Sequence, residues 1–162
     1  MTTTRATTSL RSIPLQHPRL PCGVSWTAIG DRSLLDMPQL VPVIVHRRIT
    51  EAERKAEVVR YLDLARGGAA LIGGFISPGE KEVAKGMLEI PSAKVICLLP
   101  FGLKGYKPHG VAVRWLAESK TLVLSGFPES VPATPINYEN CHLNNDWARQ
   151  IAGAGGDKSP GS

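Results

Sequence analysis

The amino-acid sequence predicts an α/β protein in three layers, with a mostly parallel sheet of four or more strands and helices on both faces. Two observations support this class. Four short apolar segments of strand length alternate with segments that carry helix-start and helix-stop signals, and each connection is long enough for a parallel crossover. The apolar segments also show almost no alternation with polar residues, as expected for strands covered on both sides.

The first strand and helix are predicted from residues 41–66. Residues 41–46 are short, rich in β-branched side chains and followed by a break, which is typical of an interior strand. Thr50 and Glu53 have the spacing of a capping box, which opens a helix ending at residue 65 or 66 before Gly67. We expect its apolar face to contain Ala56, Val59, Leu62 and Leu64 or Ala65.

The second strand and helix form the segment around which the rest is organised. A short apolar run predicts a strand over residues 69–75, broken by two glycines. Ser77 can cap the next helix, Pro78 suits its first position, and Glu80 completes a capping box. The helix is expected to run over residues 78–89. Further strands are predicted over residues 94–100 and 121–125, with helices over 111–118 and 138–152, the last capped by Asn137.

Both ends of the chain are expected to lie outside the domain. Residues 1–24 are rich in Thr, Ser, Arg and Pro and lack apolar periodicity, which predicts a disordered tail. A transit peptide is disfavoured because Pro14, Pro18 and Pro21 break any amphipathic helix. Residues 25–153 then form one domain, in which residues 24–40 pack on its edge, and residues 154–162 form a flexible tail.

Composition and charge narrow the functional class. The chain has 162 residues, 43% of them hydrophobic and 20% charged, and a net charge of +5. Residues 1–30 contain three arginines and no acid, so the remainder is nearly balanced, and affinity for a polyanion must come from local placement. No apolar run has the length of about 18 residues that a membrane helix needs. Three widely spaced cysteines favour a reduced, cytoplasmic setting.

The carboxyl edge of the predicted sheet is the candidate site, because open parallel sheets bind ligands there. Backbone N–H groups at the helix start after the second strand are expected to cradle a phosphate, aided by the helix dipole. Cations and aromatic rings follow the strands and are suited to neutralise phosphates and to stack on bases. The predicted phosphate- or nucleic-acid-binding residues are Arg47, Arg48, Gly73, Gly74, Phe75, Ser77, Gly79, Gly102, Lys104, Tyr106 and Lys107.

These strand ends resemble the DNA-processing protein A (Smf) family over about residues 40–153. Val45-His46-Arg47-Arg48 stands where that family has Gly-Ser-Arg, and residues 73–80 stand where it has Ser-Gly-x-Ala-x-Gly-x-Asp. Pro100-Phe101-Gly102, Ser125-Gly126 and the Ile151-Ala152-Gly153 end echo its later motifs, with glutamate for aspartate and Ser-Gly for Ser-Glu as departures. The resemblance implies a Rossmann-like domain that binds single-stranded DNA or a nucleotide, a role in DNA processing or recombination, and a recombinase partner.

Two other functions remain open. The wider superfamily includes LOG-type (lysine-decarboxylase-like) nucleotide phosphoribohydrolases, for which Glu80 is the candidate acid, although capping its helix is the simpler role. A degenerate domain acting only through a protein partner would expose Trp26, Trp115 and Trp147, whereas their positions favour burial. The residues favour a binding protein over an enzyme. No cofactor, metal site or membrane partner is expected, and uncovered strand edges are compatible with a homodimer.

Overall fold

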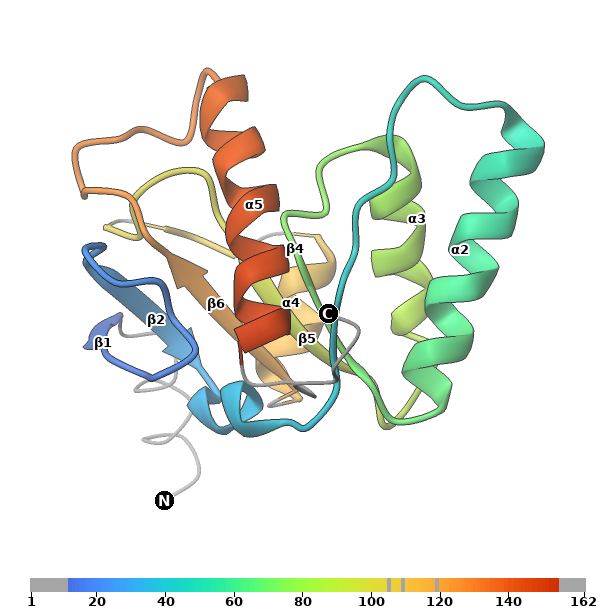
Figure 1. The fold of residues 1–162 in the computed structure, drawn as a ribbon, viewed down its shortest axis with the longest axis horizontal. Coiled ribbons are helices and arrows are strands. Elements are labelled where there is room, and N and C mark those ends of the chain that lie inside the picture. Colours follow the sequence, from blue (N-terminus) through green and yellow to red (C-terminus); the bar gives the residue numbers. More distant parts are fainter. Residues whose placement is uncertain (1–11, 105, 109, 119, 155–162) are drawn as a thin grey trace.

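The structure, a computed structural model, describes residues 12–154 apart from residues 105, 109 and 119 (Figure 1). The described residues form six strands, four α-helices and one 3-10 helix. The strands are β1 (Ile13–Leu15), β2 (Trp26–Gly30), β3 (Leu40–Pro42), β4 (Ala70–Gly73), β5 (Lys94–Leu98) and β6 (Thr121–Ser125). The helices are η1 (Arg32–Asp36), α2 (Glu51–Arg66), α3 (Pro78–Met87), α4 (Val111–Ala117) and α5 (Tyr138–Ala154).

The six strands form one sheet in the order β1-β2-β6-β5-β4-β3. The four strands from β3 to β6 are parallel neighbours, and in β4 the residue Leu71 lies between Val41 of β3 and Val95 of β5. β2 joins β6 in antiparallel orientation, and β1 joins β2 in the same way. The mostly parallel sheet predicted from the sequence is therefore confirmed, and an antiparallel pair extends it.

Three helices cover one face of this sheet. The parallel strands follow one another in space as they do in the chain, and right-handed crossovers then place the connecting helices α2, α3 and α4 on the same side. Tyr61 of α2, Val83 of α3 and Trp115 of α4 belong to one buried cluster with Leu71 and Val95 of the strands. This face supplies the first of two cores.

Helix α5 and η1 cover the opposite face. Because side chains alternate along a strand, Ile72 and Leu98 point away from the first core. They form the second core with Leu35 of η1 and with Trp147 and Ile151 of α5. Figure 1 shows α5, in red, in front of the sheet and α4 behind it. The three-layer α/β architecture is thereby confirmed.

The three tryptophans are interior residues. Trp26, Trp115 and Trp147 are 4%, 3% and 6% exposed. The rings of Trp26 and Trp147 meet edge to face with centroids 4.8 Å apart, which connects β2 to α5. The preference for burial over a tryptophan-lined partner surface is confirmed.

Both capping boxes predicted from the sequence are present. Thr50 and Glu53 close the N-terminus of α2, and Ser77 and Glu80 close that of α3. The predicted apolar face of α2 is wrong at Ala56, which is exposed, and at Val59, which is 56% exposed. The helix buries Ala65, as predicted, together with Tyr61, which was not predicted, because it packs against α3 as well as on the sheet.

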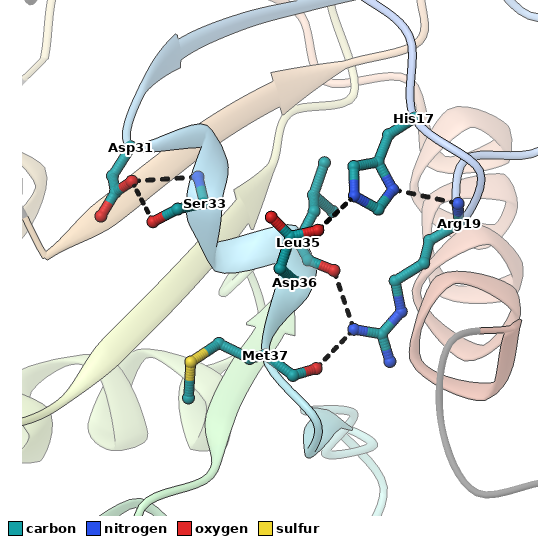
Figure 2. A network of polar contacts seen from close by, with 7 residues as sticks. All are labelled: His17, Arg19, Asp31, Ser33, Leu35, Asp36 and Met37. Carbon is teal, nitrogen blue, oxygen red and sulfur yellow. Dashed lines mark hydrogen bonds and ion pairs between the residues drawn. The ribbon is translucent and has the colours of Figure 1, made fainter.

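The predicted disordered tail is wrong for residues 12–24, and residues 1–11 lie outside the described part. The domain therefore begins before residue 25. Arg19 is 6% exposed, and its Nη1 donates hydrogen bonds to the carbonyls of Leu35 and Met37 at 2.9 and 2.6 Å (Figure 2). Its Nη2 donates to the carbonyl of Ala152 at 3.4 Å, so one side chain joins this segment to η1 and α5. Of the predicted flexible tail, Ala154 instead ends helix α5, and residues 155–162 lie outside the described residues.

Candidate functional site

A cleft of about 800 Å³ opens at the carboxyl edge of the parallel strands. Residues 44–49 of the β3–α2 loop form one wall, and residues of the β4–α3 loop and the start of α3 form the floor. The first turns of α5 form the other wall. The cleft lies where open α/β sheets bind their ligands, as the sequence predicts.

Three side chains fix the start of the β3–α2 loop, just before Arg47 and Arg48. The hydroxyl of Tyr61 lies 3.2 Å from both the backbone nitrogen and the carbonyl oxygen of Ile44. The N–H of Val45 donates to Glu80 Oε2 at 3.0 Å, and its carbonyl accepts from Ser77 Oγ at 2.7 Å. These bonds satisfy the backbone of Ile44 and Val45, which the short strand β3 leaves unpaired. The residues that follow are therefore presented from an anchored position.

The cations of this loop are exposed at the cleft. Arg47 and Arg48 both line it, and among the described residues neither forms an ion pair with an acid. His46 lines the same wall. The structure thus brings together Arg47 and Arg48 with Gly74 and Ser77, four of the residues predicted from the sequence.

The start of α3 already holds a carboxylate. Glu80 is 6% exposed, and its Oε1 accepts hydrogen bonds from the backbone N–H groups of Ile76 at 3.0 Å and Ser77 at 3.4 Å. The N–H of Glu80 itself donates to Ser77 Oγ at 3.3 Å. The prediction that free amides cradle an anion here is wrong for these three groups, because two of them already donate to the Glu80 carboxylate and the third donates to the Ser77 hydroxyl. The capping role of Glu80 is confirmed.

Helix α5 contributes residues that the sequence analysis did not select. Tyr138, Cys141, His142 and Asn145 all line the cleft, and Tyr138 is 66% exposed. Their spacing of three, four and seven residues places them on one face of a helix, which is the signal that could have identified them. Burial and the nearby charge of Glu80 raise the pKa of the Cys141 thiol, while Arg47 partly offsets this.

Three predicted residues next to the cleft are packed inside. Phe75 is 8% exposed, and its ring meets that of Trp115 edge to face with centroids 5.6 Å apart, so it is not available to stack on a base. Gly73 lies against the carbonyl of Val43, and Gly79 lies beneath the Val45 side chain. The two glycines permit this close packing, which explains them without a ligand.

The loop after β5 lies outside the cleft. Gly102 is buried and donates its N–H to the carbonyl of Val131 at 3.0 Å. Burial raises the pKa of the half-buried Tyr106, whose ring lies 6.3 Å from that of Phe101. Lys104 and Lys107 are exposed, and the backbone N–H of Lys104 donates to Glu129. The structure therefore does not join these four predicted residues to Arg47 and Arg48 in one pocket.

A metal site, a membrane-spanning helix or a reactive thiol would each point to a further function of the described residues. They contain no group of three or more His, Cys, Asp or Glu side chains placed to hold a metal ion. Within the same ranges, no helix has both the length and the apolar character needed to cross a membrane. The buried thiol of Cys97 has its pKa raised to about 12 by burial, so it is not a ready nucleophile.

The chain resembles known proteins in its structure rather than in its sequence. No protein-family model matches the sequence, and no curated protein sequence matches it. DNA processing protein A from Helicobacter pylori, described as binding single-stranded DNA, superposes with a TM-score of 0.64 at 19% identity, over 88% of this chain and 66% of that one. DNA processing protein A from Streptococcus pneumoniae gives a TM-score of 0.62 at 15% identity, over 92% and 54%.

The chain thus spans about two thirds of the first of these proteins and about half of the second. At such low identity the likeness concerns the fold, and it covers both the parallel strands and their helices. The chain is a Rossmann-like α/β domain of the kind found in DNA processing protein A.

Proposed function

We propose that this chain binds single-stranded nucleic acid, with phosphates held by Arg47 and Arg48 over the cleft. The observation that carries the proposal is a pair of exposed arginines without ion-pair partners among the described residues, on a loop anchored by Tyr61, Ser77 and Glu80. Guanidinium groups bind phosphate oxygens in a bidentate manner, and an anchored loop loses less entropy on binding. The likeness in fold to the Helicobacter pylori protein, which is described as binding single-stranded DNA, supports the same ligand.

Tyr138 is the side chain best placed to stack on a base. Its ring is 66% exposed at the opposite wall of the cleft, and it takes the role that the sequence analysis gave to Phe75. Stacking on an aromatic ring contributes about 1–3 kcal/mol per base and tolerates any sequence. A strand held by phosphates on one wall and a base on the other fits a non-specific binder.

The charges around the cleft determine on which side a bound nucleic-acid strand leaves it. Next to the cleft, on the α2 side, a second hollow is lined by Glu53 and Glu57, and hydrogen bonding to Arg60 holds the pKa of Glu57 below its usual value. Arg60 offsets the charge of Glu57 through an ion pair of 2.9 Å, so the repulsion of phosphates on that side comes chiefly from Glu53. The strand therefore leaves toward α5 and the loop after β5, where the exposed Lys104 and Lys107 provide outer contacts.

The finer roles rest on the likeness alone. A part in DNA processing or recombination and a recombinase partner are proposals that the cleft neither requires nor opposes. A homodimer is a separate proposal, which rests on the uncovered strand edges. A mononucleotide is the alternative ligand of the same cleft. A phosphoribohydrolase needs an acid free to act on its substrate, whereas Glu80 is engaged by three backbone N–H groups.

The test is an affinity measurement with paired variants. In fluorescence anisotropy titrations with a 3′-labelled oligothymidylate, the variant Arg47→Ala/Arg48→Ala should bind about 10- to 100-fold more weakly. The control Lys55→Ala/Lys85→Ala removes the same charge from exposed positions of α2 and α3 that do not line the cleft, and should change affinity by less than about twofold. Equal losses in both variants would show a general charge effect and contradict the proposed site.

A further inference from the structure

The start of α3 differs from a typical phosphate-binding helix start in what its amides bind. Such a site offers free N–H groups and the positive end of the helix dipole to an anion. Here Glu80 Oε1 accepts from Ile76 and Ser77 at 3.0 and 3.4 Å, and Ser77 Oγ accepts from Glu80 N–H at 3.3 Å. Pro78 has no N–H group, and Gly79 is buried beneath Val45. An internal carboxylate therefore takes the place of a ligand's phosphate.

We propose that Glu80 makes the cleft selective for phosphodiesters over terminal phosphomonoesters, which rests on the proposed binding of single-stranded nucleic acid. Glu80 lines the floor of the cleft while holding the amides that a terminal phosphate would need. The donors left for a ligand are side chains of the two walls, chiefly Arg47 and Arg48, and these contact an internal phosphate of a strand as well as a terminal one.

Charge favours the same selection. A phosphomonoester carries nearly two negative charges at pH 7, whereas a phosphodiester carries one. The Glu80 carboxylate is 6% exposed, so water screens its repulsion of a second ligand charge poorly. Arg47 and Arg48 attract that second charge too, but they are exposed, so water weakens their attraction more than it weakens the repulsion by the buried Glu80. A terminal phosphate thus gains little from the arginines and is opposed by Glu80.

Glu80 also positions the arginines, and the two roles must be separated by experiment. Its Oε2 accepts from Val45 N–H at 3.0 Å, two residues before Arg47, and Ser77 Oγ donates to the Val45 carbonyl at 2.7 Å. Loss of positioning lowers the affinity for all ligands by the same factor. Loss of selectivity changes the ratio between two ligands, and that ratio is the measured quantity.

The test compares one oligothymidylate with a 5′-hydroxyl and with a 5′-phosphate, both labelled at the 3′ end. The wild-type chain should bind both within about twofold, and thymidine 5′-monophosphate should compete about tenfold less well than the dinucleotide with one phosphodiester. A 5′-phosphate form that binds more than about fivefold more tightly would overturn the inference while leaving the proposed function intact. Absence of binding to either form would remove the proposed function, and the inference with it.

Two variants assign the selectivity to its residue. Glu80→Gln removes the charge and turns an N–H-donating amide toward one of the bound backbone groups, so it should raise the preference for the 5′-phosphate by about fivefold. Ser77→Ala weakens the hold on Val45 but keeps the Glu80 charge, so it should weaken both forms without changing their ratio. If folded Glu80→Gln shows the same ratio of affinities for the two forms as the wild type, the selectivity does not come from Glu80. If that variant does not fold, the comparison of the two forms with the wild-type chain still tests whether the cleft is selective.

Discussion

The side chain of Glu80 joins the two loops of the cleft, because its Oε2 accepts a hydrogen bond from the backbone N–H of Val45 at 3.0 Å, 35 residues earlier in the chain. The other oxygen, Oε1, caps the helix that Glu80 belongs to. One carboxylate thus serves local helix formation and a contact between distant segments. A capping box, read from the sequence, reveals only the first of these roles.

Glu80→Gln should lower the free energy of unfolding by about 1–3 kcal/mol, because one buried N–H group loses its acceptor. The control is Glu53→Gln in the capping box of α2, where the bond between Thr50 N–H and Glu53 is exposed and water can replace the lost acceptor. That change should cost about 0.5 kcal/mol or less. Urea unfolding followed by circular dichroism measures both, and equal costs would contradict the linking role.

Phe75 has a φ of 55°, in the left-handed region that side chains other than glycine rarely adopt. Phe75→Ala should cost about 3–5 kcal/mol, because it removes a buried ring packed on Trp115. Phe75→Gly loses the same ring but relieves about 1 kcal/mol of backbone strain, so it should be no less stable than the alanine variant.

The control for this comparison is a position with ordinary helical geometry. Ala56→Gly at an exposed position of α2 should cost about 1 kcal/mol, the usual preference of a helix for alanine. The order of stabilities in thermal unfolding is the measurement. A glycine variant at position 75 that is clearly less stable than the alanine variant would show that the backbone there is not strained.

Arg19→Met should lower the free energy of unfolding by about 2–4 kcal/mol, because it keeps much of the apolar stem but leaves the carbonyls of Leu35 and Met37 without their charged donor. The neighbouring pair of His17 and Asp36 is the control, since Asp36 is 72% exposed. Asp36→Asn should change stability by less than about 1 kcal/mol. Similar costs at both positions would contradict the anchoring role of Arg19.

The thiols should differ in reactivity and in their effect on alkaline stability. In the folded protein the exposed Cys22 should react with Ellman's reagent, while Cys97 should react only as fast as the protein opens. The pKa of Cys97 is raised to about 12 in the folded state, from about 9 for a free thiol. Above pH 9 the unfolded chain therefore releases a proton that the folded chain retains, so stability falls as pH rises, by about 1 kcal/mol at pH 10.

Cys97→Ala should remove that part of the alkaline slope in urea midpoints measured at pH 8 and pH 10. Some slope should persist, because burial also raises the pKa of Tyr106 and acts in the same direction. A slope that is identical in the variant and the wild type would contradict the assignment to Cys97.

The parallel half of the fold was readable from local patterns. Thr50 with Glu53 and Ser77 with Glu80 mark helix starts through bonds that span three residues, and the strands between them are continuous apolar runs. β1 and β2 were missed because their evidence is distant in sequence. Ile13 and Pro14 form a strand only by pairing with β2, which itself depends on β6.

The residues of the cleft also divide into those that the local sequence reveals and those that depend on distant segments. Arg47 and Arg48 directly follow a predicted strand, so their place at the carboxyl edge could be inferred. Tyr138 and His142 reach the cleft because α5 packs on the opposite face of the sheet and begins at its carboxyl edge. This placement depends on tertiary structure and cannot be read from the local sequence. Phe75 was assigned to the surface because its local sequence does not reveal that the backbone turns the ring onto Trp115.

The salt dependence of binding to an oligothymidylate tests the central claim most directly. Each phosphate neutralised on a single strand contributes about 0.7 to the slope of log affinity against log salt. We expect wild-type affinity to fall about tenfold or more between 50 and 200 mM salt, and the slope of Arg47→Ala/Arg48→Ala to be smaller by about 1.4. A wild-type affinity that is flat over this range, or a slope unchanged in the double variant, would contradict phosphate binding at these two arginines.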